Sequence, residues 1–409
     1  MTKNILVFFD GTGNEGGILL DESRTNVYKL YRATRSGPDS TIDPHKQLAF
    51  YIHGIGTPEP GKPFTLRDLI QQMFGGGLTK RIIDGYAAIL SVWRQGDRIY
   101  LFGFSRGAYV ARCLAHVVEL FGIPTQDGHK REISLEPSAL RKICKEAVRV
   151  LYFCGYAKHE SPARTQGIER FRQKYACQIG PETGAAPYFI GVWDTVAAVG
   201  WSRFLKRGYD LHLPKTVRFA RHAMAIDEYR KDFARVKWGG HNLPETQPGQ
   251  PDAFQQIWIA GNHSDIGGSY PENESRLSDI ALKWMADFIK SELPTEAQVQ
   301  VDDRVLVLYP SADGMMHDEC MVGIGGTPLK WYPSDRDVPH DAILHPTVYE
   351  RLKLEAVRNF TSYGKYRPMP LRDHDKAKQY FEPELRSPPK KSEGTPATPR
   401  SRRKTEPTE

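Results

Sequence analysis

Short apolar runs alternate with amphipathic segments along the first 290 or so residues of this chain. Short apolar runs that stop at glycine or a polar residue indicate buried strands. We expect such strands at 5–9, 47–52, 98–102, 188–193 and 255–260. Apolar residues recur at helical spacing in the segments between them. These predict helices at 26–31, with Asn26 as the cap, and at 78–95, 108–120, 217–233 and 277–289, with several more between 137 and 178.

Strands that alternate with helices form a parallel sheet covered by helices on both faces. We therefore expect one large α/β domain over 1–295, with a helical insertion at about 125–180 that could act as a lid. The segment 296–385 reads as a loop-rich extension packed on that domain, with one short strand at 305–309. Residues 386–409 hold five prolines and almost nothing apolar, which predicts a disordered tail.

Charge, hydropathy and cysteine content limit the partners and the cellular compartment that we expect for the protein. The net charge is +7, but 386–409 carry seven Lys/Arg against three Glu, so the tail supplies +4 and the other 385 residues only +3. Specific nucleic-acid binding is therefore not expected, although the tail could contact an anionic membrane surface. The mean hydropathy of −0.51 and the lack of a long apolar run predict no transmembrane segment or signal peptide. Five cysteines without a CxxC pair favour a reducing cytoplasm.

The strongest chemical motif is Gly-Phe-Ser-Arg-Gly at 103–107, between a predicted strand and a predicted helix. Glycines that flank a serine on such a tight turn let the neighbouring chain pass close by and lift the hydroxyl above the sheet edge. The following helix offers free N–H groups to an oxyanion. The pattern predicts Ser105 as a nucleophile; the alternative is a glycine-rich turn whose serine caps the helix.

A serine nucleophile needs a histidine base and an acid that orients it. Asp194 and His263 each follow a predicted strand, and the order Ser, Asp, His along the chain is the one this arrangement requires. Asp265, two residues after His263, remains the competing acid, although it also fits an Asx turn before Gly-Gly. We expect ligands to bind here, because parallel sheets bind them at the carboxyl ends of strands.

A second glycine cluster, Asp-Gly-Thr-Gly-Asn at 10–14, ends the first strand. Backbone N–H groups of Gly11 or Thr12 could complete an oxyanion hole with that of Arg106. The same segment matches G-x-G-x-x-G, but no helix follows at once, which argues against a nucleotide site. The Arg106 side chain could reach an anionic group of the substrate, such as a phosphate, or form a structural salt bridge.

Three other histidines are considered for structural or metal-binding roles. His222 falls in the predicted helix 217–233 and reads as structural. His340 and His345 are weak metal-ligand candidates in a loop-rich segment. We predict no metal and no organic cofactor, because acyl transfer through a serine needs neither.

Six ordered motifs together resemble one family, the uncharacterised α/β-hydrolase domain that includes the catalytic domain of type VI secretion phospholipase effectors. The resemblance covers about residues 3–290, with a weaker echo at 345–351. It implies an α/β-hydrolase fold and places the nucleophile on Ser105, the acid on Asp194 and the base on His263. The motifs are at 8–14, 54–57, 103–109, 192–196, 221–228 and 261–268.

From the motifs and the resemblance together we expect a serine esterase or lipase whose substrate is a lipid or phospholipid ester. A small soluble ester or thioester is the next substrate class, and a non-catalytic binding module on the same fold is the alternative function. An immunity protein or a secretion component could be a partner, with delivery by a Sec-independent route. Only a loop-rich segment and a basic tail follow the domain, where effectors of this family usually carry membrane-engaging modules.

Overall fold

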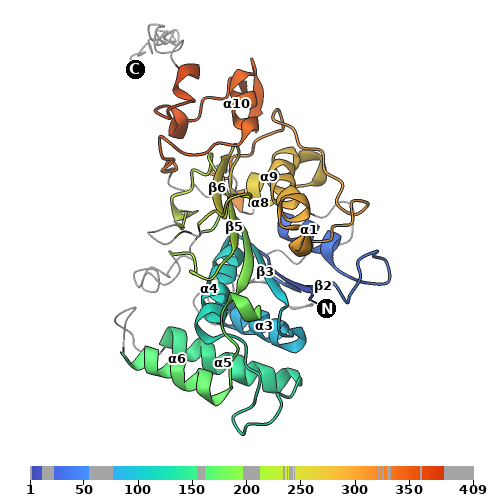
Figure 1. Cartoon of the computed structure of the whole chain (residues 1–409). Helices are drawn as coiled ribbons and strands as arrows, with labels where there is room; N and C mark the ends of the chain where they lie inside the picture. The colour runs from blue at the N-terminus through green and yellow to red at the C-terminus, as the bar shows by residue number, and fades with distance from the viewer. Residues whose placement is uncertain are drawn as a thin grey trace, which may run out of the picture.

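A wholly parallel six-stranded sheet lies at the centre of the molecule, with the strand order β2-β1-β3-β4-β5-β6 (Figure 1). The computed structural model describes residues 2–11, 23–54, 77–153, 162–196, 212–233, 235–236, 238, 243, 245–320, 323–324, 327–328, 333–359 and 362–381. The strands are β1 (Asn4–Phe9), β2 (Gln47–Ile52), β3 (Arg98–Phe104), β4 (Pro187–Trp193), β5 (Phe219–Ala225) and β6 (Phe254–Ile259).

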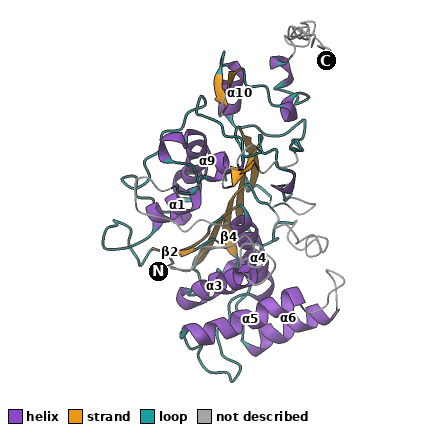
Figure 2. Cartoon of the chain, turned by 180° about the vertical axis from the view of Figure 1, so that it is seen from behind, coloured by secondary structure: helices purple, strands orange, loops and turns teal. Residues whose placement is uncertain are grey.

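Helices cover both faces of this sheet, which explains why its central strands are apolar throughout. On one face lie α3 (Gly77–Val92) and α4 (Arg106–Phe121), and on the other α1 (Asn26–Thr34) and α9 (Arg276–Asp287) (Figures 1 and 2). The apolar residues of β1 are fully buried between the two layers. The predicted α/β class with a mostly parallel sheet is confirmed.

The helical insertion contains α5 (Pro137–Phe153) and α6 (Pro162–Lys174), which lie outside α3 and α4 (Figure 2). Its contacts with α4 fall on the middle and the C-terminal end of that helix: Tyr152 bonds the carbonyl of Cys113, and Phe171 packs edge-on against Phe121. Cys113 lies about 12 Å along the helix from Ser105, at 1.5 Å per residue. These helices therefore pack away from the start of α4, and a lid role for the insertion stays a prediction.

Three sequence-based expectations about elements were wrong. The segment predicted as a helix at 217–233 contains β5, because pairing between β4 and β6 buries every residue from Phe219 to Ala225. The strand expected at 305–309 is a turn followed by irregular chain. The cap of α1 is Thr25 rather than Asn26, whose side-chain amide instead bonds the carbonyls of Ile266 and Ser278.

The C-terminal part of the chain packs beside β6 around a third apolar cluster that includes Trp258, Leu344 and Tyr366. The elements of this part are β7 (Gly323–Ile324), β8 (Thr327–Pro328), α10 (Pro346–Lys353), β9 (Val357–Asn359) and β10 (Ser362–Gly364). The short helix α8 (His263–Gly267) lies earlier in the chain, between β6 and α9. The predicted disordered tail at 386–409 lies outside the described residues. Within the described ranges, none of the helices is long and apolar enough to span a bilayer.

Candidate functional site

The predicted nucleophile, acid and base follow three strands of the sheet at its carboxyl edge. Ser105 directly follows β3 and Asp194 directly follows β4, and the Ser105 N–H donates to the Trp193 carbonyl at 3.1 Å. The Asp194 N–H in turn donates to the Ala223 carbonyl of β5 at 2.8 Å. His263 opens the short helix α8 a few residues after β6. The register of the parallel strands thus brings these residues, far apart in sequence, to one edge.

Ser105 lies on a strained turn at the start of α4. Its φ of 59° and ψ of −124° place a residue with a Cβ in the left-handed region, at a cost of about 1–3 kcal/mol. The flanking glycines permit the turn: a Cβ on Gly107 would lie 2.1 Å from the Phe9 carbonyl oxygen, and one on Gly103 would lie 2.5 Å from the Gly107 oxygen. The Ser105 side chain makes no capping bond, so the alternative of a helix-capping serine finds no contact to support it.

The Asp194 carboxylate and the His263 imidazole form a buried hydrogen bond. His263 Nδ1 lies 2.7 Å from Asp194 Oδ2, and the two side chains are 5% and 0% exposed. The imidazole also packs against Phe104, the residue before Ser105, with ring centroids 4.6 Å apart. Phe233 meets the same imidazole edge-on. These contacts fix the ring orientation beside the Ser105 turn.

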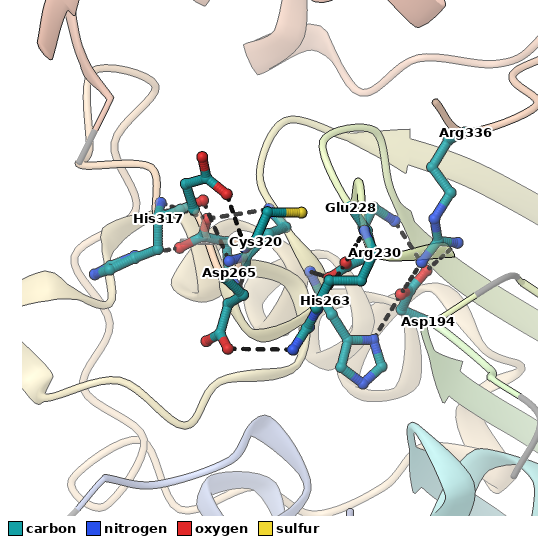
Figure 3. Close-up of polar contacts among 12 residues, drawn as sticks. Asp194, Glu228, Arg230, His263, Asp265, His317, Cys320 and Arg336 are labelled. Carbon is teal, nitrogen blue, oxygen red and sulfur yellow. Dashed lines mark hydrogen bonds and ion pairs between the residues drawn. The ribbon is translucent and has the colours of Figure 1, made fainter. Parts of the chain in front are cut away.

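Arg336 reaches the same carboxylate from the opposite side (Figure 3). Its Nη2 lies 2.9 Å from Asp194 Oδ2 and its Nη1 lies 3.3 Å from Oδ1. Burial alone would raise the pKa of Asp194, but the Arg336 charge, followed by the His263 hydrogen bond and the Ala225 N–H, holds that pKa well below its ordinary value. The carboxylate is therefore ionised at neutral pH and can only accept hydrogen bonds, which assigns the Nδ1 proton to His263.

The backbone around His263 is held by a capped loop and an acidic partner. The Asn262 side chain accepts from the Asp265 N–H, and the Asp265 carboxylate accepts from the Asn262 N–H, which completes a capping box. Glu228 accepts from the His263 N–H at 3.2 Å and receives a bidentate pair of bonds from Arg230. Burial raises the pKa of Glu228, but Arg230 outweighs it, so the pKa is lowered.

Asp265, the competing acid, pairs with a different histidine. Its Oδ1 lies 2.8 Å from His317 Nδ1, and its Oδ2 accepts the His317 N–H at 3.0 Å (Figure 3). Tyr270 stacks on the His317 ring at 3.6 Å between centroids, and Glu274 lies 3.2 Å from its Nε2. Burial lowers the pKa of His317, but Asp265 and then Glu274 raise it overall. A second carboxylate–imidazole pair thus supports the loop that carries His263.

Two of the three predicted oxyanion donors, Arg106 and Gly11, lie in the described part of the chain. The Arg106 N–H belongs to the first turn of α4 and has no acceptor among the described residues. The Gly11 N–H instead donates to Asp10 Oδ1 at 2.6 Å. Thr12 lies outside the described residues. Asp10 is fully buried, and burial raises its pKa to about 6 despite bonds from Tyr51 and Thr25.

The remaining histidine candidates have structural contacts. His222 is buried on β5, accepts the Thr195 N–H at Nε2 and has its pKa lowered to about 3, chiefly by burial. His345 caps α10, and exposed His340 lies 3.3 Å from Asp375. Within the described ranges, no group of three or more His, Cys, Asp or Glu side chains could hold a metal ion.

Sequence reasoning missed the charged residues around the proposed triad. Arg336 is separated from Asp194 by 142 positions and lies in a segment where no element was assigned. Glu228 and Arg230 sit two residues apart at the end of a strand that was misread as a helix. A strand assignment for that segment would have placed Glu228 at the carboxyl edge, whereas no local pattern marks Arg336.

The chain is similar to known proteins in sequence and in structure. It is 29% identical over 251 residues to the uncharacterized protein YEL023C of Saccharomyces cerevisiae, a match that covers 57% of this chain and 32% of that protein. The chain therefore spans about a third of the length of this curated relative.

Two solved structures are similar to the chain at low identity. An uncharacterized protein from Pseudomonas aeruginosa matches at 18% identity and a TM-score of 0.43, over 76% of this chain and 48% of its own. The Tle1 effector bound to the VgrG spike of the type 6 secretion system matches at 22% identity and a TM-score of 0.33, over 68% and 52%. The sequence model described as "T6SS, Phospholipase effector Tle1-like, catalytic domain" matches residues 3–288, and the chain belongs to this family.

Proposed function

We propose that the protein is a serine hydrolase that cleaves a carboxylic ester of a phospholipid or related lipid. The observation that carries the proposal is the buried bond between His263 Nδ1 and Asp194 Oδ2, beside the strained Ser105 turn. Membership of the Tle1-like phospholipase family supports a lipid ester as the substrate. The resemblance to this family gave the same three residues from their motifs.

The contacts around His263 determine which of its nitrogens takes part in proton transfer. Nδ1 donates to the ionised Asp194, which leaves the lone pair on Nε2. Nε2 accepts the proton of Ser105 as Oγ attacks the ester carbonyl carbon and the carbonyl π electrons move to its oxygen. The N–H of Arg106 at the start of α4 is the donor proposed for that oxyanion. Nε2 then returns the proton to the leaving alcohol as the C–O bond breaks.

The second half of the reaction releases the acyl group. A water molecule gives a proton to His263 Nε2 and attacks the acyl carbon, and the carbon–Oγ bond to Ser105 then breaks with return of the proton. Asp194 accepts from Nδ1 throughout, which stabilises the imidazolium formed in each half. The products are a carboxylate and an alcohol, and no external oxidant or reductant is consumed.

The Gly11 amide is not the second oxyanion donor in the arrangement observed, because it is bonded to Asp10 Oδ1. Rotation of that peptide would free the donor. Burial raises the pKa of Asp10 to about 6. When this carboxyl takes up a proton, it becomes a weaker acceptor for the Gly11 N–H. We therefore propose Arg106 as the principal donor and keep Gly11 and Thr12 as candidates for the second.

The proposal is tested by fatty-acid release from vesicles of defined phosphatidylcholine or phosphatidylglycerol, with short-chain nitrophenyl esters as the soluble alternative. Wild type releases fatty acid, and Ser105→Ala reduces the rate by at least about 1000-fold, the scale for loss of a triad nucleophile. Ser138→Ala, an exposed serine on α5, is the matched control and retains full rate. Equal rates in wild type and Ser105→Ala would contradict the proposal, and hydrolysis of soluble esters alone would exclude a lipid substrate.

A further inference from the structure

Two arginine side chains lie near the Ser105 turn. Arg106 directly follows Ser105, and Arg81 projects from α3. Among the described residues, no carboxylate lies within ion-pair distance of either guanidinium, so the salt-bridge alternative for Arg106 finds no partner. Surface arginines can be left solvated at little cost, but these two are largely removed from water.

Arg81 is the more unusual of the two because it is only 5% exposed. Its Nη2 donates to the carbonyls of Asp10 and Ile52, at 2.6 and 3.2 Å. Its Nη1 and Nε are buried and have no hydrogen-bond partner among the described residues. Nine other arginines in that part of the chain share an unpartnered buried Nε, so the unpartnered Nη1 is what distinguishes Arg81. Buried donors without an acceptor are rare in native proteins, and each one calls for an explanation such as a ligand or a water molecule.

The Asp10 carbonyl ties Arg81 to the nucleophile turn. The same oxygen that accepts from Arg81 Nη2 lies 2.5 Å from the position a Cβ on Gly107 would occupy. Gly107 follows Arg106 and is two residues from Ser105. The Arg81 guanidinium is therefore in contact with the end of β1, against which the turn that carries Ser105 is packed.

Both guanidinium groups carry a positive charge near the Ser105 turn. Burial lowers the pKa of Arg106 and that of Arg81 to about 10; at Arg81 the Asp10 charge opposes this shift and the weaker contribution of the Arg106 charge adds to it. Both remain protonated at neutral pH. The neighbouring carboxyl, Asp10, already accepts bonds from Gly11, Thr25 and Tyr51. An anion bound beside Arg81 and Arg106 would offset their positive charges and supply the acceptors that Arg81 lacks.

We propose that Arg81 and Arg106 form a binding site for the phosphodiester of the lipid head group, next to the ester that Ser105 attacks. This inference rests on the proposed function. Guanidinium groups present planar pairs of donors that match phosphate oxygens. In a glycerophospholipid the phosphate is joined to the ester-bearing glycerol by a few bonds, so both groups must be held in one site. The arginine pair thus selects phospholipids over uncharged glycerides.

The activity test compares two substrates with identical acyl chains, a phosphatidylcholine and a diacylglycerol, in neutral detergent micelles. Arg106→Gln and Arg81→Gln each lower kcat/KM for the phospholipid by about 10- to 100-fold, as expected for lost charge-assisted bonds. The loss of kcat/KM on the diacylglycerol is at least about fivefold smaller, so the preference for the phospholipid falls, and Arg106→Lys recovers part of that preference. Arg131→Gln, an exposed arginine far along the chain, changes neither rate. Equal losses on both substrates, or no loss on either, would overturn the assignment.

A binding test decides the assignment even without turnover. Glycerophosphocholine and inorganic phosphate are titrated calorimetrically into folded Ser105→Ala, and then into the same protein carrying Arg106→Gln or Arg81→Gln. Glycerophosphocholine binds saturably, and each arginine replacement weakens it at least about tenfold. Affinity unchanged by either replacement, or binding of inorganic phosphate alone, would refute the head-group site. A different result would show that the proposed function itself is wrong: wild-type protein would then hydrolyse neither the phospholipid nor the diacylglycerol.

Discussion

Replacement of Arg336 by methionine would test how strongly the C-terminal segment supports the proposed site. The guanidinium lies 2.9 Å from Asp194 Oδ2, and the two side chains are 4% and 0% exposed. Methionine fills similar space but leaves the carboxylate of Asp194 buried with His263 and the Ala225 N–H as its remaining partners. Removal of one partner from a buried ion pair costs about 3–5 kcal/mol, and we expect a loss of that size in the free energy of unfolding.

The stability contributed by the pair of Arg336 and Asp194 changes with pH in a direction that can be predicted. The folded-state pKa of Asp194 is depressed below its ordinary value of 3.8, so the ion pair contributes its full stability above that pH. This contribution is lost as the pH falls through the lower folded-state pKa. The difference between wild type and Arg336→Met is therefore constant between about pH 5 and 8 and shrinks only in strong acid.

Urea unfolding followed by circular dichroism at pH 7 and at pH 4 measures this difference. Arg131→Met is the matched control, because Arg131 is 72% exposed and its pair with Asp127 contributes only about 0–1 kcal/mol. In an Asp194→Asn background, Arg336→Met costs at least about 2 kcal/mol less than in wild type, because the charge it would leave unpaired is already absent. A loss under 1 kcal/mol in the wild-type background, or an equal loss in both, would refute the reasoning.

Three further predictions concern the turn and the loop. Ser105→Gly raises the free energy of unfolding by about 1 kcal/mol in urea titrations because it relieves a strained φ; an unchanged or lower value would contradict the strain. Gly107→Ala lowers the thermal midpoint by about 10 °C or more or prevents soluble expression, whereas Gly364→Ala, with open space around its Cβ, leaves it nearly unchanged; equal midpoints would contradict the packing. The raised pKa of His317 predicts a stability term that is present below its ordinary pKa of 6.5 and lost as pH rises through the folded value; His317→Gln removes this slope, and an unaltered profile would exclude the pair.

Most of the parallel sheet was predictable because five of its six strands contain short apolar runs that stop at glycine or a polar residue. β5 was not, because Arg221 and His222 interrupt the run and Ala223 and Met224 fit a helix equally well. Pairing with β4 and β6 decides the conformation, and such pairing is a tertiary effect that no local pattern reports.

The site was predictable only as far as it depends on strand ends. Asp194 and His263 are 69 positions apart, yet each follows a strand, so the carboxyl edge of the sheet marks both. Arg336 comes from a segment of irregular chain whose path over the domain is set by packing around β6, and nothing in its sequence indicates contact with Asp194. The pairing of Asp265 with His317 was missed for the same reason.

Covalent labelling with a fluorophosphonate probe, read as intact mass, tests the triad most directly. Wild type gains one adduct; Ser105→Ala gains none, and labelling is slowed at least about 1000-fold in His263→Ala and Asp194→Asn. Asp265→Asn, whose carboxylate faces His317, labels within about tenfold of wild type. Absence of labelling in folded wild type, or labelling that survives Asp194→Asn but not Asp265→Asn, would contradict the assignment of Ser105, His263 and Asp194.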